Sequence, residues 1–119
     1  MSLKESFSEK ALLWISKKST TAVKGMAEGY EPPKTFTNKE TGEKIQPDFS
    51  FESPSGNKYY TDIALKSEYP QALVTRWKLL SLMATMSHGK LYLLTPKGHK
   101  MFTQKLVDSY KIDATIHSI

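Results

Sequence analysis

An aspartate and a lysine stand at the two ends of a short stretch in the middle of the chain. Asp48 follows a proline and opens one alternating apolar run, and Lys66 closes the next run, with a turn at residues 54–57 between them. Phosphodiester hydrolysis needs charge neutralised on the phosphoryl oxygens and a water made nucleophilic. Carboxylates that hold Mg²⁺ supply the first and, with a lysine beside the water, the second. An aspartate and a lysine are residue types that this chemistry uses, and two adjacent strands would bring them to one place.

A second acid, Asp62, lies inside the second run. Strand alternation points Asp62, Ala64 and Lys66 to the same face of the sheet. A half-buried acid needs a partner, and Lys66 is the obvious cation in this stretch. The pair therefore has a structural interpretation, an ion pair, beside the catalytic one.

These residues require elements that hold them, and periodicity predicts their order. Apolar residues at three- and four-residue steps predict a helix over residues 6–27, with Ser6 and Glu9 at capping-box spacing. Short strands are expected around Phe36 and Ile45, then over residues 49–51, 59–65, 91–94 and 112–119. Two more helices are expected, one opened by Pro70 and closed by Gly89, the other following the Thr95–Pro96 cap. The order predicts one α/β domain over residues 1–119, with a mixed sheet flanked by helices.

This order, with the motif residues, resembles the PD-(D/E)XK superfamily, the restriction-endonuclease-like nucleases. Pro47-Asp48 matches the family's Pro-Asp, and Ile63-Ala64-Leu65-Lys66 matches its apolar–acid–apolar–Lys motif apart from Ala64. The resemblance implies an αβββαβ core with an added C-terminal helix and strand. It covers most of the chain.

The resemblance also implies roles. Asp48 would be a metal ligand, the Leu65 carbonyl a backbone ligand of Mg²⁺, and Lys66 the group that orients the water. Small members of the superfamily often act as homodimers, so a homodimer is a further implication.

Ala64 stands where the family places its second acid and cannot bind metal. Asp62 is the first candidate to replace it, although it lies roughly 6.5–7 Å further back along the strand. Glu68, Glu9 and Glu28 are other candidates. One secure carboxylate and a lysine bind Mg²⁺ weakly, which favours weak or absent nuclease activity.

The bulk properties agree with a nucleic-acid partner. The chain has 119 residues and a net charge of +5, nearly all of its basic residues being lysines, with Arg76 the single arginine. Contacts to DNA or RNA would then go mainly to backbone phosphates and weaken with salt. The chain has no cysteine and no apolar run long enough to span a bilayer, and we expect a cytoplasmic protein.

Two alternatives stay open. The stretch Leu91-Tyr92-Leu93-Leu94-Thr95-Pro96-Lys97-Gly98 is similar to the wing-to-helix segment of winged-helix DNA-binding proteins. The third possibility is a non-enzymatic interaction domain that would use its helical faces and the 31–46 loop. The three histidines lack ligand spacing, and Tyr59, Tyr60 and Tyr92 either pack in the core or stack on bases.

Overall fold

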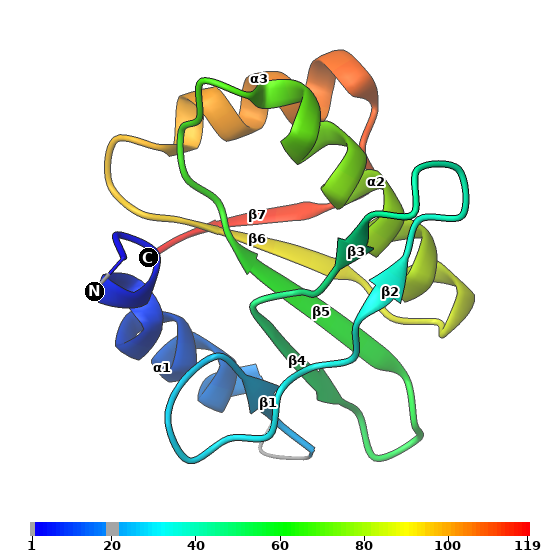
Figure 1. Ribbon diagram of the computed structural model, residues 1–119. Coiled ribbons are helices and arrows are strands. Elements are labelled where there is room, and N and C mark those ends of the chain that lie inside the picture. The colour runs from blue at the N-terminus through cyan, green and yellow to red at the C-terminus, as the bar shows by residue number, and fades with distance from the viewer. Residues whose placement is uncertain (1, 19–21) are drawn as a thin grey trace.

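The centre of the molecule is a five-stranded mixed sheet, seen in a computed structural model that describes residues 2–18 and 22–119 (Figure 1). Its strands are β1 (Lys24–Gly25), β4 (Phe49–Glu52), β5 (Lys58–Ile63), β6 (Leu91–Thr95) and β7 (Thr115–Ser118), in that spatial order. The β1–β4 and β4–β5 pairs are antiparallel, and the β5–β6 and β6–β7 pairs are parallel. A separate hairpin is formed by β2 (Phe36–Thr37) and β3 (Lys44–Ile45).

Helices cover both faces of this sheet, as the sequence predicts (Figure 1). A 3₁₀ turn (Glu5–Phe7) leads into α1 (Ser8–Lys18), whose Ala11 and Ile15 pack on one face. The longer α2 (Pro70–Met86), α3 (Lys100–Tyr110) and the β2–β3 hairpin cover the other. The coarse prediction, a mixed α/β fold, is therefore confirmed. Across the described part of the chain, no helix is long and apolar enough to cross a membrane.

The strand patterns explain this layering. Phe49 and Phe51 alternate with more polar residues, and both pack against α1. The apolar run of β6 lies between two parallel neighbours and is covered on both faces, so its leucines divide between the two cores. Gly56, at φ +90°, closes the β4–β5 turn in a conformation that suits glycine.

The first helix is shorter than predicted: α1 ends at Lys18, residues 19–21 lie outside the described part of the chain, and residues 22–27 are not helical. Lys24–Gly25 instead forms β1 on the edge of the sheet, paired with β4. A Cβ at Gly25 would lie 2.3 Å from Phe49 Cδ1, so only glycine allows this approach. Val23 keeps its place in the core from this extended segment, which is why the apolar spacing mimicked a longer helix.

Two helix boundaries also differ from expectation. Thr95 is the last residue of β6 and does not cap a helix, since α3 begins five residues later at Lys100 after a turn at Gly98 (φ +89°). Pro70 does open α2, and the Gly89 N–H closes its other end by donating to Ala84 O at 2.8 Å, with His88 at a positive φ of 60°. Ser6 donates to Leu3 O instead of capping the helix.

The winged-helix alternative requires a compact helix-turn-helix upstream of residues 91–100. The structure has there the antiparallel strands β4 and β5 followed by the single helix α2. Residues Leu91–Thr95 form a central strand of the sheet and not an exposed wing.

Candidate functional site

The candidate site lies at the edge of the sheet where β5 and β6 end. Because β4 is antiparallel to β5, the start of β4 lies at this same edge. The N-terminal segment and the connections β5–α2 and β6–α3 gather on this side (Figure 1). In open α/β sheets, ligands bind outside the carboxyl ends of parallel strands.

Asp48 and Asp62 face each other at this edge. Phe49 pairs with Thr61, and continuing that register places Asp48 opposite Asp62. The Asp48 N–H donates to Asp62 Oδ1 at 3.0 Å, and the Ile63 N–H donates to Asp48 Oδ2 at 2.9 Å. Both side chains are buried. The structure therefore brings two of the predicted site residues together.

The position across from Asp48 is thus Asp62 and not Ala64. Ala64 lies two residues further on, where its N–H donates to Leu94 O at 2.8 Å. It is completely buried in the core between the sheet and α2. The distance along the strand from Ala64 to Asp62 does not count against Asp62 as a site residue, because Asp62, and not Ala64, lies opposite Asp48.

Arg76 and Trp77 from α2 hold the Asp62 carboxylate. Arg76 Nε donates to Oδ2 at 2.5 Å, and its second nitrogen donates to Oδ1 at 2.9 Å. Trp77 Nε1 donates to Oδ2 at 3.1 Å. With the Asp48 N–H, Asp62 accepts four hydrogen bonds, which fills the acceptor capacity of a carboxylate. Burial favours the neutral acid, but the hydrogen bonds and charge of Arg76 outweigh it and keep the pKa of Asp62 below its ordinary value.

Lys4 holds the Asp48 carboxylate. Its Nζ lies 2.8 Å from Oδ2, and the nearest Arg76 nitrogen lies 3.6 Å from Oδ1. Burial raises the pKa of Asp48 to about 6, and the negative charge of Asp62 acts in the same direction, whereas Lys4 opposes both. Asp48 is therefore the acid of this pair that titrates closest to neutral pH.

Lys66 lies at the same edge but does not serve as the predicted partner of Asp62. That partner is Arg76, so this expectation was wrong. The Lys66 side chain is exposed, and its N–H donates to His99 Nδ1 at 2.9 Å, which ties the ends of β5 and β6 together. Leu65, the predicted backbone ligand, packs its side chain against the α1 core. Glu9, Glu28 and Glu68 are exposed.

Sequence reasoning missed Lys4, Arg76, Trp77 and His99. One signal was present for Arg76, the single arginine of the chain, which stands beside Trp77 in an otherwise apolar helix face. A cation on the buried face of a helix needs a buried acid. Nothing in the sequence spacing pointed to Lys4.

The donor set does not fit Mg²⁺ in this arrangement. Asp62 has no free lone pair, and Asp48 offers mainly Oδ1, with cations against both acids. Within residues 2–18 and 22–119, no group of three acidic, histidine or cysteine side chains is placed to hold a metal. Lys4 and Arg76 neutralise the negative charge that a metal ion would otherwise balance.

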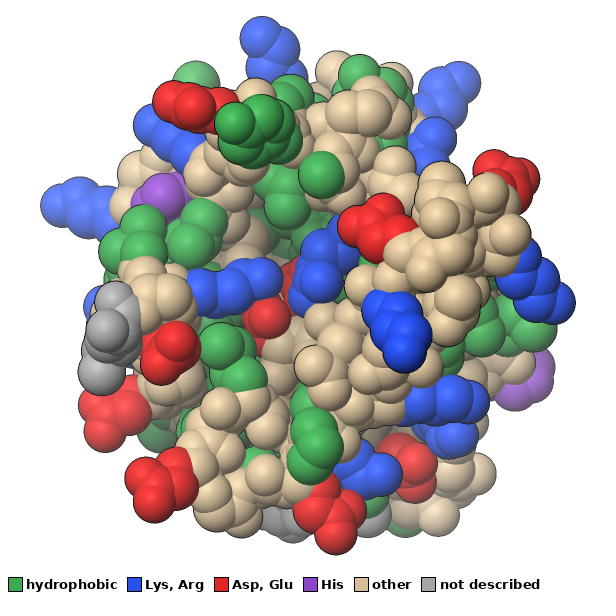
Figure 2. All heavy atoms as spheres, in the orientation of Figure 1, with side chains coloured by type: hydrophobic (Ala, Val, Ile, Leu, Met, Phe, Trp, Pro, Cys, Tyr) green, Lys and Arg blue, Asp and Glu red, His purple; other side chains and the backbone are tan. Residues whose placement is uncertain are grey.

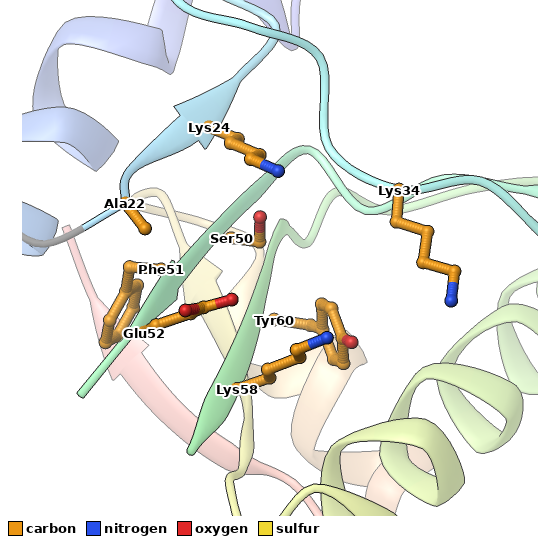
Figure 3. Close-up of a pocket in the computed structure, with 8 residues that line it drawn as sticks. All are labelled: Ala22, Lys24, Lys34, Ser50, Phe51, Glu52, Lys58 and Tyr60. Atoms are coloured by element: carbon orange, nitrogen blue, oxygen red, sulfur yellow. The ribbon is translucent and has the colours of Figure 1, made fainter. Parts of the chain in front are cut away.

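Figure 2 shows basic and acidic side chains meeting in a hollow near the centre of the face that it draws. A second basic feature is a small pocket of about 90 Å³ toward the turn end of β4 and β5. Figure 3 shows Lys24, Lys34 and Lys58 around it, from β1, the loop before β2 and β5, with Glu52 on β4 among them. Its Ser50 and Tyr60 lie on neighbouring strands.

No protein-family model, curated protein or solved structure matches this chain. Its function is therefore inferred from the residues and their geometry.

Proposed function

We propose that this protein binds nucleic acid through a restriction-endonuclease-like core with a closed acid pair. By this we mean that Lys4 and Arg76 already hold the carboxylates of Asp48 and Asp62 in ion pairs. Hydrolysis would then be weak or absent. The observation that carries the proposal is the direct opposition of Asp48 and Asp62 at the edge where β5 ends. Two carboxylates on adjacent strands at this position are what the resemblance calls for, and the sequence motif alone did not reveal the pairing.

The order of elements supports the same proposal. After α1, β1 and an inserted β2–β3 hairpin, the antiparallel β4–β5 pair, α2 and the parallel strand β6 follow one another, and α3 with β7 forms the added C-terminal unit. The additional antiparallel strand is the short β1, the outermost strand of the sheet, which pairs with β4.

Charge supports a phosphate-bearing ligand. Lys66, Lys97 and Lys100 are exposed and follow the carboxyl ends of β5 and β6, next to the partly exposed Lys4 and Arg76. Asp48 and Asp62 are buried and paired, so they add little to this surface, on which the lysines stand beside the exposed acids Glu43, near Arg76, and Glu68. Cations grouped in this way neutralise backbone phosphates without reading sequence.

The closed acid pair argues against efficient hydrolysis. Opening it for a metal would separate Asp62 from Arg76 and leave a buried charge unpaired, at a cost of about 3–5 kcal/mol before any metal bond forms. The motif position two residues before Lys66 is buried Ala64, so it offers no replacement ligand.

The test is equilibrium binding of a fluorescent 20-base-pair duplex, followed by anisotropy from 50 to 300 mM salt. We expect affinity to fall linearly on a log–log plot against salt, and to weaken in the double variant Lys66→Ala/Lys97→Ala with a shallower slope. Lys105→Ala, on the exposed face of α3, is the matched control and should bind as the unaltered protein does. A protein that binds neither duplex nor single strands at low salt would overturn the proposal.

One observation favours a second candidate, a protein-interaction role. An open groove of about 690 Å³ runs between α2 and the β2–β3 hairpin. It is lined by Phe36, Leu79 and Met83 together with Leu82 and Met86, which are 55% and 67% exposed. Its rim carries Glu40 as well as Lys39 and Lys78, so a second copy related by a twofold axis could pair opposite charges across it.

Sedimentation velocity tests this candidate. A concentration-dependent dimer that Leu82→Glu abolishes and Leu13→Glu, on exposed α1 surface, leaves intact would support it. A monomer at every concentration up to hundreds of micromolar would rule out self-association through this groove.

A further inference from the structure

A layer of aromatic rings lies on the face of the sheet that α1 only partly covers. The Phe51 and Tyr59 rings are stacked at 5.1 Å with an angle of 13° between their planes. Tyr92 continues the layer, 6.3 Å from Phe51 and 6.2 Å from Tyr59, at 15° and 26°. Three adjacent strands, β4, β5 and β6, therefore present nearly parallel rings. We call Phe51, Tyr59 and Tyr92 the aromatic layer.

This layer is bounded by the end of α1. Trp14 meets Tyr92 edge-on at 4.9 Å, and the His117 ring lies 5.1 Å from Trp14. The Lys18 Nζ lies 5.5 Å from the Trp14 ring centre and 5.9 Å from that of Tyr92. A cation thus stands directly over the edge of the aromatic layer.

The layer is open to solvent beyond α1. A cavity of about 180 Å³ is lined by Phe51, Tyr59 and Tyr92 together with Lys18, Ser53 and Pro54. Tyr59 and Tyr92 are half-buried, so part of each side chain is exposed, whereas Phe51 is buried.

The local charge suits an anion next to a planar group. Burial lowers the pKa of His117, and the positive charges of Lys18 and Lys100 lower it further. Glu52 alternates with Phe51 along β4 and lines the separate pocket around Lys24 and Lys58. Among the described residues that line the cavity of the aromatic layer, Lys18 is the cation and none is an acid.

We infer that the aromatic layer binds an unpaired base of single-stranded nucleic acid, with Lys18 against the adjoining phosphate. Sequence-tolerant binding of single strands combines aromatic rings on a sheet with nearby cations, and every base has a face that can stack. Duplex bases are stacked on one another and cannot enter this cavity. The site lies on the opposite face of the sheet from Asp62 and Arg76, so it is separate from the acid pair.

The inference rests on the proposed nucleic-acid function, and one set of titrations separates the two. The probes are a labelled 12-base oligothymidylate and a 12-base-pair duplex, both measured by anisotropy at 50 mM salt. Tyr92→Leu and Tyr59→Leu should each weaken single-strand binding about 5- to 100-fold, the effect of losing one stacked base. Their duplex affinity should not change.

Two further variants keep the test decisive. Lys18→Glu, at an exposed helix end, should weaken single-strand binding without disturbing the core. Tyr110→Leu, 42% exposed on α3, is the matched control and should bind like the unaltered protein.

The possible results of these titrations distinguish the base site from the proposed function. Single-strand affinity that is unchanged in Tyr59→Leu, Tyr92→Leu and Lys18→Glu, while the duplex still binds, overturns the base site and leaves the proposed function standing. Equal losses for both probes in folded variants also overturn it, because stacking would then not be the cause. A protein that binds neither probe overturns the proposed function, and the base site with it.

Discussion

The Asp48 N–H donates to the carboxylate of Asp62 at 3.0 Å, so the two acids of the candidate site are linked through the backbone as well as through Arg76, which lies against both. Asp62 is saturated with four donors, whereas Asp48 accepts from Ile63 and contacts Lys4. The two carboxylates therefore have different chemistry: Asp62 is a fixed structural anion, and Asp48 is the one that can change its charge.

Removing Arg76 should be strongly destabilising. Arg76→Met would leave the Asp62 charge buried with two neutral donors, and we expect a loss of about 3–5 kcal/mol in the free energy of unfolding. Urea denaturation measures this, with Lys78→Met in the same helix as an exposed control. A loss below about 1 kcal/mol would show that Asp62 does not depend on Arg76.

Stability should depend on pH through Asp48. The folded protein keeps a proton on this carboxyl up to a pKa of about 6, whereas the unfolded chain releases it near 3.8. Between those values the folded state binds more protons, so the free energy of unfolding falls as pH rises from about 4 to about 6, by at most about 3 kcal/mol, and is then level.

This fall is measured as the difference between the protein and Asp48→Asn in urea melts from pH 4.5 to 7.5. Asp108→Asn, on exposed α3, is the control. Asp62, whose pKa is lowered, loses its contribution only at still lower pH, so it does not obscure this range. Parallel profiles for the protein and Asp48→Asn would contradict the assignment.

Lys4→Ala should destabilise the protein in a pH-dependent way. The Lys4 side chain is 29% exposed, so water screens its contact with Asp48, and we expect a loss of about 1–2 kcal/mol at pH 7.5. At pH 5 the loss should shrink because Asp48 is then mostly protonated. Lys10→Ala on α1 is the control, and an equal loss for Lys4→Ala at both pH values would mean that the ion pair is not its cause.

A close backbone contact at Gly89 gives a prediction about the fold. A Cβ there would lie 1.6 Å from the Lys58 carbonyl oxygen, so Gly89→Ala must displace the start of β5 or the end of α2. We expect a loss of at least about 3 kcal/mol. Gly56→Ala, at φ +90° with open space around it, should cost only about 1–2 kcal/mol. Thermal melts compare the two, and equal losses would contradict the contact.

Local patterns predicted the strands and the turn between β4 and β5 because alternation and turn residues act over a few positions. They predicted too long a first helix, because Val23 is apolar at helical spacing but packs in the core from an extended segment. The partner of Asp62 could not be predicted, since Arg76 reaches it from α2 only after the helix packs on the sheet. Likewise, the alignment of Asp48 with Asp62 depends on strand register, which the sequence motif with Ala64 obscured.

The most direct test of the central claim is cleavage of labelled single-stranded and duplex DNA at micromolar protein with 10 mM Mg²⁺ or Mn²⁺. We predict binding that weakens with salt and no product above that of the Asp48→Ala variant after hours. Metal-dependent cleavage that is lost in both Asp48→Ala and Asp62→Asn, with the fold of each variant intact, would contradict this account and show that the acid pair opens to hold a metal.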